Sequence, residues 1–284
     1  MSSSKVRPNV PGYQVMDLLG VGARSTIWRV RHRRTSNLYA LKRVYREVVD
    51  DSRFINQALN EFRVARHFDH PAIRRYERLK KMRRWRTIRE LHLFMELCEG
   101  MDCQNNRPTE IGAIVRVFLQ VAHALAHIRA RGYVHADIKP NNIIVAKDGT
   151  VKIIDFGQSC RIGTVKERIQ GTPDFIAPEQ VHRRPLDART DVFNFGAALY
   201  WTLTAQPIPT VLPKKTGGIQ LIGDMNIPPP EELNPDVSPG LDKLVRDCIE
   251  LNPARRPQSV RELISRLEVI QHTLARANGP PPAE

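Results

Sequence analysis

One set of residues in the N-terminal half is suited to holding phosphate groups. The glycine-rich run Leu19–Ile27 lies between two expected strands, where a loop of small residues can lie over phosphates and offer them backbone N–H groups. Lys42 follows on the third expected strand, and Glu61 on the next expected helix supplies a carboxylate to hold it. Such a pair contributes little on a surface, but in a cleft it aims a cation at phosphates. An ordinary hairpin turn stays the alternative for the run, because Ser25 stands at the third glycine position.

Two further motifs lie in the middle of the chain. His135-Ala136-Asp137-Ile138-Lys139-Pro140-Asn141-Asn142 comes first, and Asp155-Phe156-Gly157 follows the expected strand Val151–Ile154. With Ala177-Pro178-Glu179 further along, they have the order and spacing of the catalytic loop, metal-binding motif and peptide-docking segment of protein kinases. The chain therefore resembles the eukaryotic-type serine/threonine protein kinases from about residue 13 to 274, and in appearance it is nearest to their bacterial members.

The resemblance implies transfer of the ATP γ-phosphate to a protein hydroxyl. Phosphoryl transfer needs an in-line nucleophile and neutralised phosphate oxygens. Asp137 is the expected catalytic base, which accepts or orients the proton of the substrate hydroxyl, and Lys139 is expected to stabilise the charge of the transferred group. Asn142 and Asp155 are the expected Mg²⁺ ligands, because magnesium prefers hard oxygen donors.

The resemblance also implies the contacts to ATP. The backbone of Glu96 and Cys98 is expected to hydrogen-bond the adenine, Met95 to line the back of its pocket, and Asp102 to meet the ribose. The apolar side chains of Ile27, Ala40 and Ile144 are expected to sandwich the adenine ring. Lys42 and Glu61 are expected to be catalytic, together with Asp137 and Lys139. The residues expected to contact the nucleotide are Leu19, Gly20, Val21, Gly22, Ala23, Arg24, Ser25, Thr26, Ile27, Ala40, Lys42, Met95, Glu96, Cys98, Asp102 and Ile144.

Three supporting roles follow from the same resemblance. Thr172, like Lys139, is the residue type of serine/threonine kinases, which disfavours specificity for tyrosine. Glu179 is expected to pair with Arg256, and Asp191 to brace the backbone of the catalytic loop.

The chain departs from the family at Ala136. Most members have an arginine there, which receives a phosphate from the activation segment. We therefore expect activity not to depend on phosphorylation of residues 155–179, whose candidate acceptors outside the docking motif are Ser159 and Thr164.

Composition bounds the class of protein. With 284 residues, 41% of them hydrophobic, the chain can bury a substantial core. Its formal charge of +14 is uneven, with a basic cluster at residues 80–89. Trp85 and Ile88 interleave with this cluster as in a strand pair with one solvated face, and no nucleic-acid-binding motif is present, so we expect no nucleic-acid function. The basic surface favours acidic partners.

Location is predicted from what the chain lacks. Residues 1–12 have no apolar signal-peptide core, and the most apolar stretch, Ile111–Ile128, is interrupted by polar residues, so we expect no membrane segment and a cytoplasmic protein. The four cysteines have neither zinc-site nor disulfide spacing.

The pattern of strands and helices predicts a two-lobed layout, and the resemblance implies an α+β, bilobal protein kinase fold: a small antiparallel-sheet N-lobe (about 13–97) with one key helix, and a larger, mainly helical C-lobe (about 98–274). Residues 1–12 are expected to be an extension and 275–284 a Pro-rich tail. The expected strands are Tyr13–Leu19, Thr26–His32 and Leu38–Val44, and the expected helices are Phe54–Phe68, stopped by Pro71, then Ile111–Arg129, Asp191–Thr204, Leu241–Leu251 and Ser259–Thr273.

Two other functions stay open. A pseudokinase scaffold would bind partners without catalysis, but it predicts the loss of at least one of Lys42, Glu61, Asp137, Lys139, Asn142 and Asp155. A small-molecule kinase is disfavoured by the peptide-docking segment Gly171–Glu179. The leading hypothesis is an enzyme with protein substrates that carry Ser/Thr acceptors, which includes possible autophosphorylation.

Overall fold

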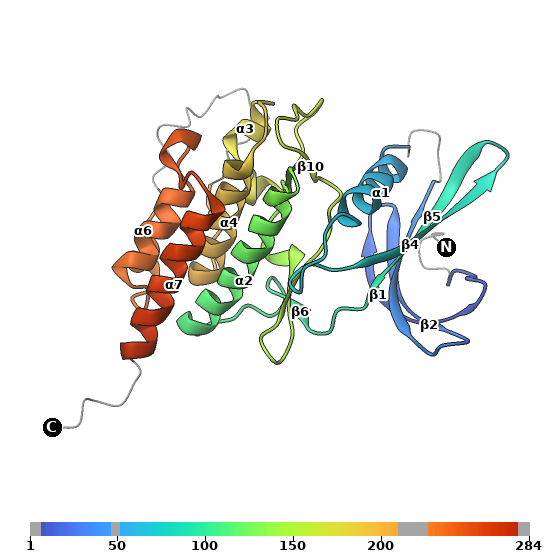
Figure 1. The fold of residues 1–284 in the computed structure, drawn as a ribbon, viewed down its shortest axis with the longest axis horizontal. Coiled ribbons are helices and arrows are strands. Elements are labelled where there is room, and N and C mark those ends of the chain that lie inside the picture. Colours follow the sequence, from blue (N-terminus) through green and yellow to red (C-terminus); the bar gives the residue numbers. More distant parts are fainter. Residues whose placement is uncertain (1–6, 47–51, 210–226, 278–284) are drawn as a thin grey trace. The chain divides into compact units, whose positions relative to one another are not determined.

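The computed structural model describes residues 7–46, 52–209 and 227–277, which form two compact units (Figure 1). The first unit is Met1–Glu99 with Asp155–Gly157, and the second is Gly100–Ile154 with Gln158–Glu284. The first is a sheet with one helix and the second is mainly helical, so the predicted fold class is confirmed.

The sheet of the first unit has five antiparallel strands in the order β1-β2-β3-β5-β4. The strands are β1 (Tyr13–Gly22), β2 (Ser25–His32), β3 (Leu38–Tyr45), β4 (Tyr76–Arg84) and β5 (Thr87–Glu96). Alternating residues of β2 are buried, as expected for a strand with one face on a core. The three predicted strands are confirmed, and the basic cluster forms a strand pair, as expected.

Helix α1 (Ser52–Ala65) packs on β3, β4 and β5. Its buried face includes Ala58, Glu61 and Ala65, in line with the predicted amphipathic period. The prediction that Pro71 ends this helix is wrong, because α1 already ends at Ala65 and a turn follows.

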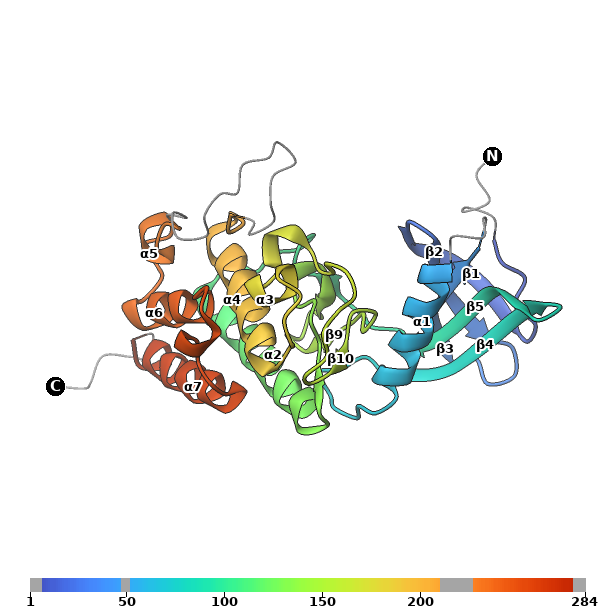
Figure 2. The same cartoon turned by 90° about the horizontal axis from the view of Figure 1, so that it is seen from above.

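The second unit is built on α2 (Ile111–Ala130), α4 (Ala188–Thr204), α6 (Pro239–Cys248) and α7 (Val260–Ala277), with the short helices α3 (Pro178–Val181) and α5 (Pro230–Leu233). Helix α2 packs against α4 and α7 (Figure 2). The short strands are β6 (Met101–Asp102), β7 (Tyr133–Val134), β8 (Ile143–Val145), β9 (Val151–Ile153) and β10 (Cys160–Arg161). They pair as β6-β8-β9 and β10-β7, and they carry the loops that hold the candidate catalytic residues.

The start of α4 differs from the prediction. The helix begins at Ala188, and its N-cap is Asp187, whose carboxylate accepts a hydrogen bond from the backbone N–H of Arg189 at 2.8 Å. Asp191 lies in the first turn, buried, and is not the cap. Sequence periodicity alone placed the start too late because the buried Asp191 resembled a capping residue.

Among the described residues, α2 is the one helix long and apolar enough to cross a membrane, with a mean hydropathy of 1.6 in its most apolar window. More than half of that window is buried inside the protein, against α4 and α7. This is the pattern of a core helix.

The predicted terminal segments fall partly outside the described residues, namely 1–6 and 278–284. Of the remainder, Val10 is buried in a cluster with Val15, Trp28, Val30 and Phe94, so the chain before Tyr13 already packs on the sheet. At the other end, α7 continues through residues 275–277, which were expected to belong to the tail.

Candidate active site

The glycine-rich run forms the turn between β1 and β2. Gly22 pairs with Ser25, which leaves Ala23 and Arg24 as the turn residues. A Cβ on Gly22 would lie 2.6 Å from the Ser25 hydroxyl oxygen. The serine at the third glycine position is therefore accommodated by the glycine opposite it, and a larger residue at position 22 would require the Ser25 hydroxyl to move.

A pocket of about 180 Å³ in the first unit adjoins this turn. Its lining residues are Ala23, Arg24, Ser25, Lys42, Val44, Phe54, Gln57, Ala58, Glu61 and Asp155. Pockets for drug-sized ligands have volumes of roughly 300–1,000 Å³. This pocket is smaller than that range, and Lys42 supplies a cation to it.

Lys42 and Glu61 form a buried ion pair between β3 and α1. Lys42 Nζ donates to Glu61 Oε2 at 2.7 Å and lies 3.8 Å from Asp155 Oδ1, and the Tyr76 hydroxyl donates to Glu61 Oε1 at 2.6 Å. Burial lowers the pKa of Lys42, but attraction to Asp155 and Glu61 outweighs it and the pKa is raised, so the cation persists. Burial raises the pKa of Glu61, against the pull of Lys42. We take this carboxylate as ionised, because two donors converge on its two oxygens.

The Asp155-Phe156-Gly157 motif is anchored in the first unit by Phe156. The Phe156 side chain is fully buried, with its ring centroid 5.3 Å from that of Phe68 and 6.2 Å from that of Tyr76. Asp155 has a φ of +63°, and its Oδ1 accepts a hydrogen bond from the Gly157 N–H at 3.1 Å. The Asp155 side chain stays 38% exposed, so its carboxylate is accessible to a hard cation.

In the second unit, Asp137 and Lys139 meet at Thr172. Lys139 Nζ lies 3.0 Å from Asp137 Oδ2 and donates to the Thr172 hydroxyl at 2.6 Å, while that hydroxyl donates to Asp137 Oδ1 at 3.1 Å. Asn142 Nδ2 donates to the Asp137 backbone carbonyl at 2.8 Å and to Oδ2 at 3.3 Å. Contacts from these three side chains hold the Asp137 carboxylate in one orientation.

The expectation that Asp191 braces the catalytic loop is confirmed. Its two carboxylate oxygens accept hydrogen bonds from the backbone N–H groups of His135 at 2.9 Å and Ala136 at 2.8 Å. Burial raises the pKa of Asp191 to about 7, although these two hydrogen bonds oppose the rise. Ala136 has a φ of +61°, a conformation that costs energy for a residue with a Cβ. The brace therefore holds the loop in a strained backbone conformation.

Gln180 links the catalytic loop to the activation segment. Its Nε2 donates to the carbonyl oxygens of Ala136 at 2.9 Å and Gln170 at 3.1 Å. Its Oε1 accepts from the Ala177 N–H and from Asn194 Nδ2 of α4, both at 3.0 Å. A single neutral, buried amide thus joins the catalytic loop, the activation segment and α4. Our sequence analysis missed this residue, because a lone glutamine carries no pattern that marks it.

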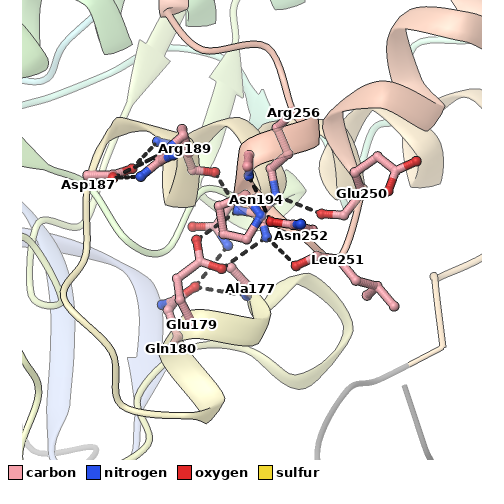
Figure 3. A network of polar contacts seen from close by, with 12 residues as sticks. Ala177, Glu179, Gln180, Asp187, Arg189, Asn194, Glu250, Leu251, Asn252 and Arg256 are labelled. Carbon is pink, nitrogen blue, oxygen red and sulfur yellow. Dashed lines mark hydrogen bonds and ion pairs between the residues drawn. The ribbon is translucent and has the colours of Figure 1, made fainter. Parts of the chain in front are cut away.

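The expected pair of Glu179 and Arg256 is confirmed. Arg256 Nη1 and Nη2 contact the two Glu179 carboxylate oxygens at 2.7 and 3.0 Å (Figure 3). Arg256 also donates to the backbone carbonyls of Glu250 and Arg189, each at 2.7 Å, and its guanidinium lies 4.9 Å from the Phe193 ring centroid. The side chain of Arg256 is completely buried, so this pair fastens the end of the activation segment to the core of the second unit.

The residues expected at the adenine lie at the end of the first unit's sheet. Ala40 pairs with Met95 across β3 and β5, and both are buried. Glu96 ends β5, and the thiol of Cys98 accepts a hydrogen bond from the buried Arg74 at 3.2 Å. This arginine was also missed by the sequence analysis.

Asp102 and Ile144 pair across β6 and β8 in the second unit. The Asp102 carboxylate caps its own turn, since it accepts hydrogen bonds from the backbone N–H groups of Gln104 and Asn105 at 3.1 and 3.0 Å and from Asn105 Nδ2 at 2.8 Å. The structure therefore gives Asp102 a local role besides the expected contact to the ribose.

The predicted site residues are divided between the two units. The first unit holds residues 19–27, Ala40, Lys42, Glu61, Met95, Glu96, Cys98 and Asp155, and the second holds Asp102, Asp137, Lys139, Asn142 and Ile144. Within each unit three of the predicted polar residues cluster: Lys42, Glu61 and Asp155 in the first, and Asp137, Lys139 and the neutral Asn142 in the second.

Comparisons with known proteins point to one family. The chain is 27% identical to a "probable serine/threonine-protein kinase" of Clostridium acetobutylicum over 92% of its own length and 40% of the relative's. It is 26% identical to serine/threonine-protein kinase pkn3 of Myxococcus xanthus over 95% of its own length and 52% of the relative's. Sperm motility kinase 2B of Mus musculus is 31% identical over 68% of this chain and 40% of that protein. The chain thus spans about half, or less, of these relatives' length.

The family assignment rests on a broader match. The family model for the protein kinase domain matches residues 13–271, which is most of the chain. This match runs through both compact units and every motif described above, so the chain belongs to the protein kinase family and resembles its bacterial serine/threonine members.

Proposed function

We propose that this chain is a serine/threonine protein kinase that transfers the γ-phosphate of Mg²⁺-ATP to hydroxyl groups of proteins. The observation that carries the proposal is the cluster of Asp137, Lys139 and Thr172 in the second unit. A carboxylate, an ammonium and a hydroxyl lie within 3.1 Å of one another there. The names of the relatives and the presence of Lys139 and Thr172 support serine and threonine as acceptors.

In this proposal Asp137 is the catalytic base. Its carboxylate, oriented by the contacts described above, takes up the proton of the substrate hydroxyl as the oxygen attacks phosphorus in line. Lys139 neutralises charge on the transferred group. Because Lys139 already contacts Asp137, its ammonium requires little reorganisation when that charge develops.

The residues present fit ATP and Mg²⁺. Lys42 is a persistent cation that lines the pocket beside the glycine-rich turn, and Glu61 holds it there. Asp155 and Asn142 offer the oxygen donors that magnesium prefers. When bound, Mg²⁺-ATP supplies the phosphoryl group and a cation that neutralises its oxygens. The apolar side chains of Ile27 and Ala40 are proposed to contact the adenine.

We also propose protein substrates, possible autophosphorylation and a cytoplasmic site of action, with the kinase domain at residues 13–274. All four cysteines are free, as is usual for proteins in a reducing compartment. We expect no role in nucleic-acid binding, since the family match accounts for most of the chain.

The test is transfer of radiolabelled γ-phosphate to the chain itself and to a generic basic protein, followed by phosphoamino-acid analysis. We expect label on serine or threonine for the native chain and a loss of about 10²-fold or more for Asp137→Asn, which keeps the size of the side chain but removes the base. Equal activity in both proteins would refute the role of Asp137. No transfer by either, with ATP still bound, would indicate the pseudokinase alternative.

We further propose that activity does not depend on a phosphate in the activation segment. Ala136 provides no cation to receive one, and Gln180 already ties the Ala136 carbonyl to the segment at Gln170. Ser159, one of two candidate acceptors, is buried and donates its hydroxyl hydrogen to the His135 carbonyl at 3.1 Å. Thr164 is the more exposed candidate.

Thr164→Ala tests this independence, with phosphatase-treated native protein as the matched sample. We expect both to retain activity within about twofold, and a collapse of either would contradict the proposal.

Gln180→Glu keeps the shape of the side chain but loses both Nε2 donations, so we expect kcat to fall while the KM for ATP changes little. If Gln180→Glu is as active as the native chain, Gln180 does not position the loop.

A further inference from the structure

The free end of the β4–β5 hairpin carries a dense positive charge. Residues 80–89 include six basic side chains and no acidic one, namely Lys80, Lys81, Arg83, Arg84, Arg86 and Arg89. Of these, Lys81, Arg83, Arg86 and Arg89 are exposed. Both views show this hairpin extending beyond the rest of the sheet (Figures 1 and 2). We call residues 80–89 the basic tip.

Trp85 occupies the apex of the basic tip. Arg84 pairs with Thr87, so Trp85 and Arg86 are the two turn residues. The Trp85 side chain is 93% exposed, and its φ is +57°. Two-residue hairpin turns usually place glycine or another small residue in such a conformation, because a bulky side chain is strained there. Exposure and strain both make Trp85 unfavourable for folding, which points to a functional reason for it.

The acidic residue that comes next in the sequence does not neutralise the basic tip. Glu90 follows it, but its two carboxylate oxygens each lie 2.8 Å from a nitrogen of Arg43 on β3. Burial tends to raise the pKa of Glu90, but hydrogen bonds from His92 and Arg43 outweigh it and lower the pKa to about 2. The charge of Glu90 is therefore balanced inside the sheet, so among the residues that the structure describes Glu90 does not offset the charge of the basic tip.

We propose that the basic tip binds the surface of an anionic phospholipid membrane, with Trp85 inserted at the level of the headgroups. Tryptophan prefers the membrane–water interface because its ring is largely apolar but carries a polar N–H. Lysine and arginine beside it attract anionic headgroups. This tethering would be peripheral and needs no membrane-spanning segment.

The shape of the basic tip disfavours nucleic acid as the partner. Single-stranded nucleic acids bind in grooves where several aromatic side chains stack on successive bases. On the described residues of the β4–β5 hairpin, Trp85 is the one exposed large hydrophobic side chain, and it lies on a projecting turn. A single exposed apolar side chain with basic residues on both sides of it in the sequence suits the surface of an anionic membrane, which is flat and negatively charged.

The experiment uses the full chain with large unilamellar vesicles made of equal parts phosphatidylcholine and phosphatidylserine, and with vesicles of phosphatidylcholine alone. We expect sedimentation with the anionic vesicles only, weakened by salt. Tryptophan fluorescence should shift to the blue on binding, chiefly from Trp85, because Trp28 is buried in the sheet and Trp201 is partly buried on α4.

Two variants separate charge from insertion. Arg83→Gln with Arg86→Gln should lower the partition coefficient by about 25-fold, or about fivefold for each lost charge. The matched control is Arg33→Gln with Arg34→Gln, two exposed arginines on the β2–β3 turn, which should lower it less than twofold. Trp85→Gly relieves the strained φ, so we expect weaker vesicle binding and an abolished blue shift without any loss of thermal stability.

Three results would overturn the proposal. The first is no binding to anionic vesicles at low salt. The second is binding that the basic-tip variants and the β2–β3 control reduce equally. The third is tighter binding to a single-stranded oligonucleotide than to the vesicles, lost in Trp85→Gly, which would assign the basic tip to nucleic acid. None depends on kinase activity, so the proposal can fail while the proposed function stands.

Discussion

Arg256→Met removes the buried cation that holds Glu179, and it replaces the guanidinium with an apolar chain of comparable length. The change leaves the Glu179 carboxylate buried without its ion pair. In the native chain Arg256 donates to the backbone carbonyls of Glu250 and Arg189, each at 2.7 Å, and the variant leaves both carbonyls without this donor. Glu179 lies in α3, at the end of the activation segment, so the damage should reach the segment as well as the core.

The magnitude follows from these contacts. Breaking a buried ion pair by removing one partner costs about 3–5 kcal/mol. We take about 4 kcal/mol for Arg256→Met, which corresponds to a fall in Tm of about 8–16 °C for a domain of this size. Glu179→Gln leaves Arg256 with an amide oxygen and its backbone carbonyls, so we expect about half that cost.

The assay is urea and thermal unfolding followed by far-ultraviolet circular dichroism, for both single variants and the double variant. Because the two side chains share one interaction, the double variant should be less destabilised than the sum of the singles by about 2 kcal/mol. A cost below about 1 kcal/mol for Arg256→Met, or additive single effects, would refute the reasoning.

Three further changes test other contacts. Tyr76→Phe removes the 2.6 Å hydrogen bond to Glu61, so we expect unfolding in urea to cost about 1 kcal/mol less and the KM for ATP to rise. An unchanged KM would show that Tyr76 does not affect ATP binding. Asp191 has a pKa of about 7 in the folded protein against about 3.9 unfolded, so its stabilising contribution is complete below the unfolded value and is lost as pH rises through 7. The urea midpoint of the native chain should therefore fall relative to Asp191→Asn between about pH 4 and 7, and parallel pH profiles would contradict this. Gly196→Ala would put a Cβ 2.4 Å from that of Cys248, so we expect a loss of about 1–3 kcal/mol in thermal unfolding, and an unchanged Tm would show that α4 and α6 can separate without cost.

Much of the fold could be predicted from the sequence because it depends on short-range patterns. Alternation over β2 and the three- and four-residue spacing of Ala58, Glu61 and Ala65 on α1 reflect which side of an element faces the core. Element ends were less predictable. Helix α4 begins at its cap, Asp187, and α1 ends before Pro71, because termini depend on hydrogen bonds that periodicity does not describe.

The sequence by itself determined the family chemistry: a lysine on a strand, a catalytic-loop aspartate and an Asp-Phe-Gly motif are contiguous or closely spaced runs, so each can be read without knowing its neighbours in space. Only the tertiary structure showed that Ser159 is buried, that Gln180 joins three segments, and that Trp85 is exposed on a strained turn. These properties depend on residues far apart in the chain, or on the absence of any packing partner, and neither condition leaves a mark on the local sequence.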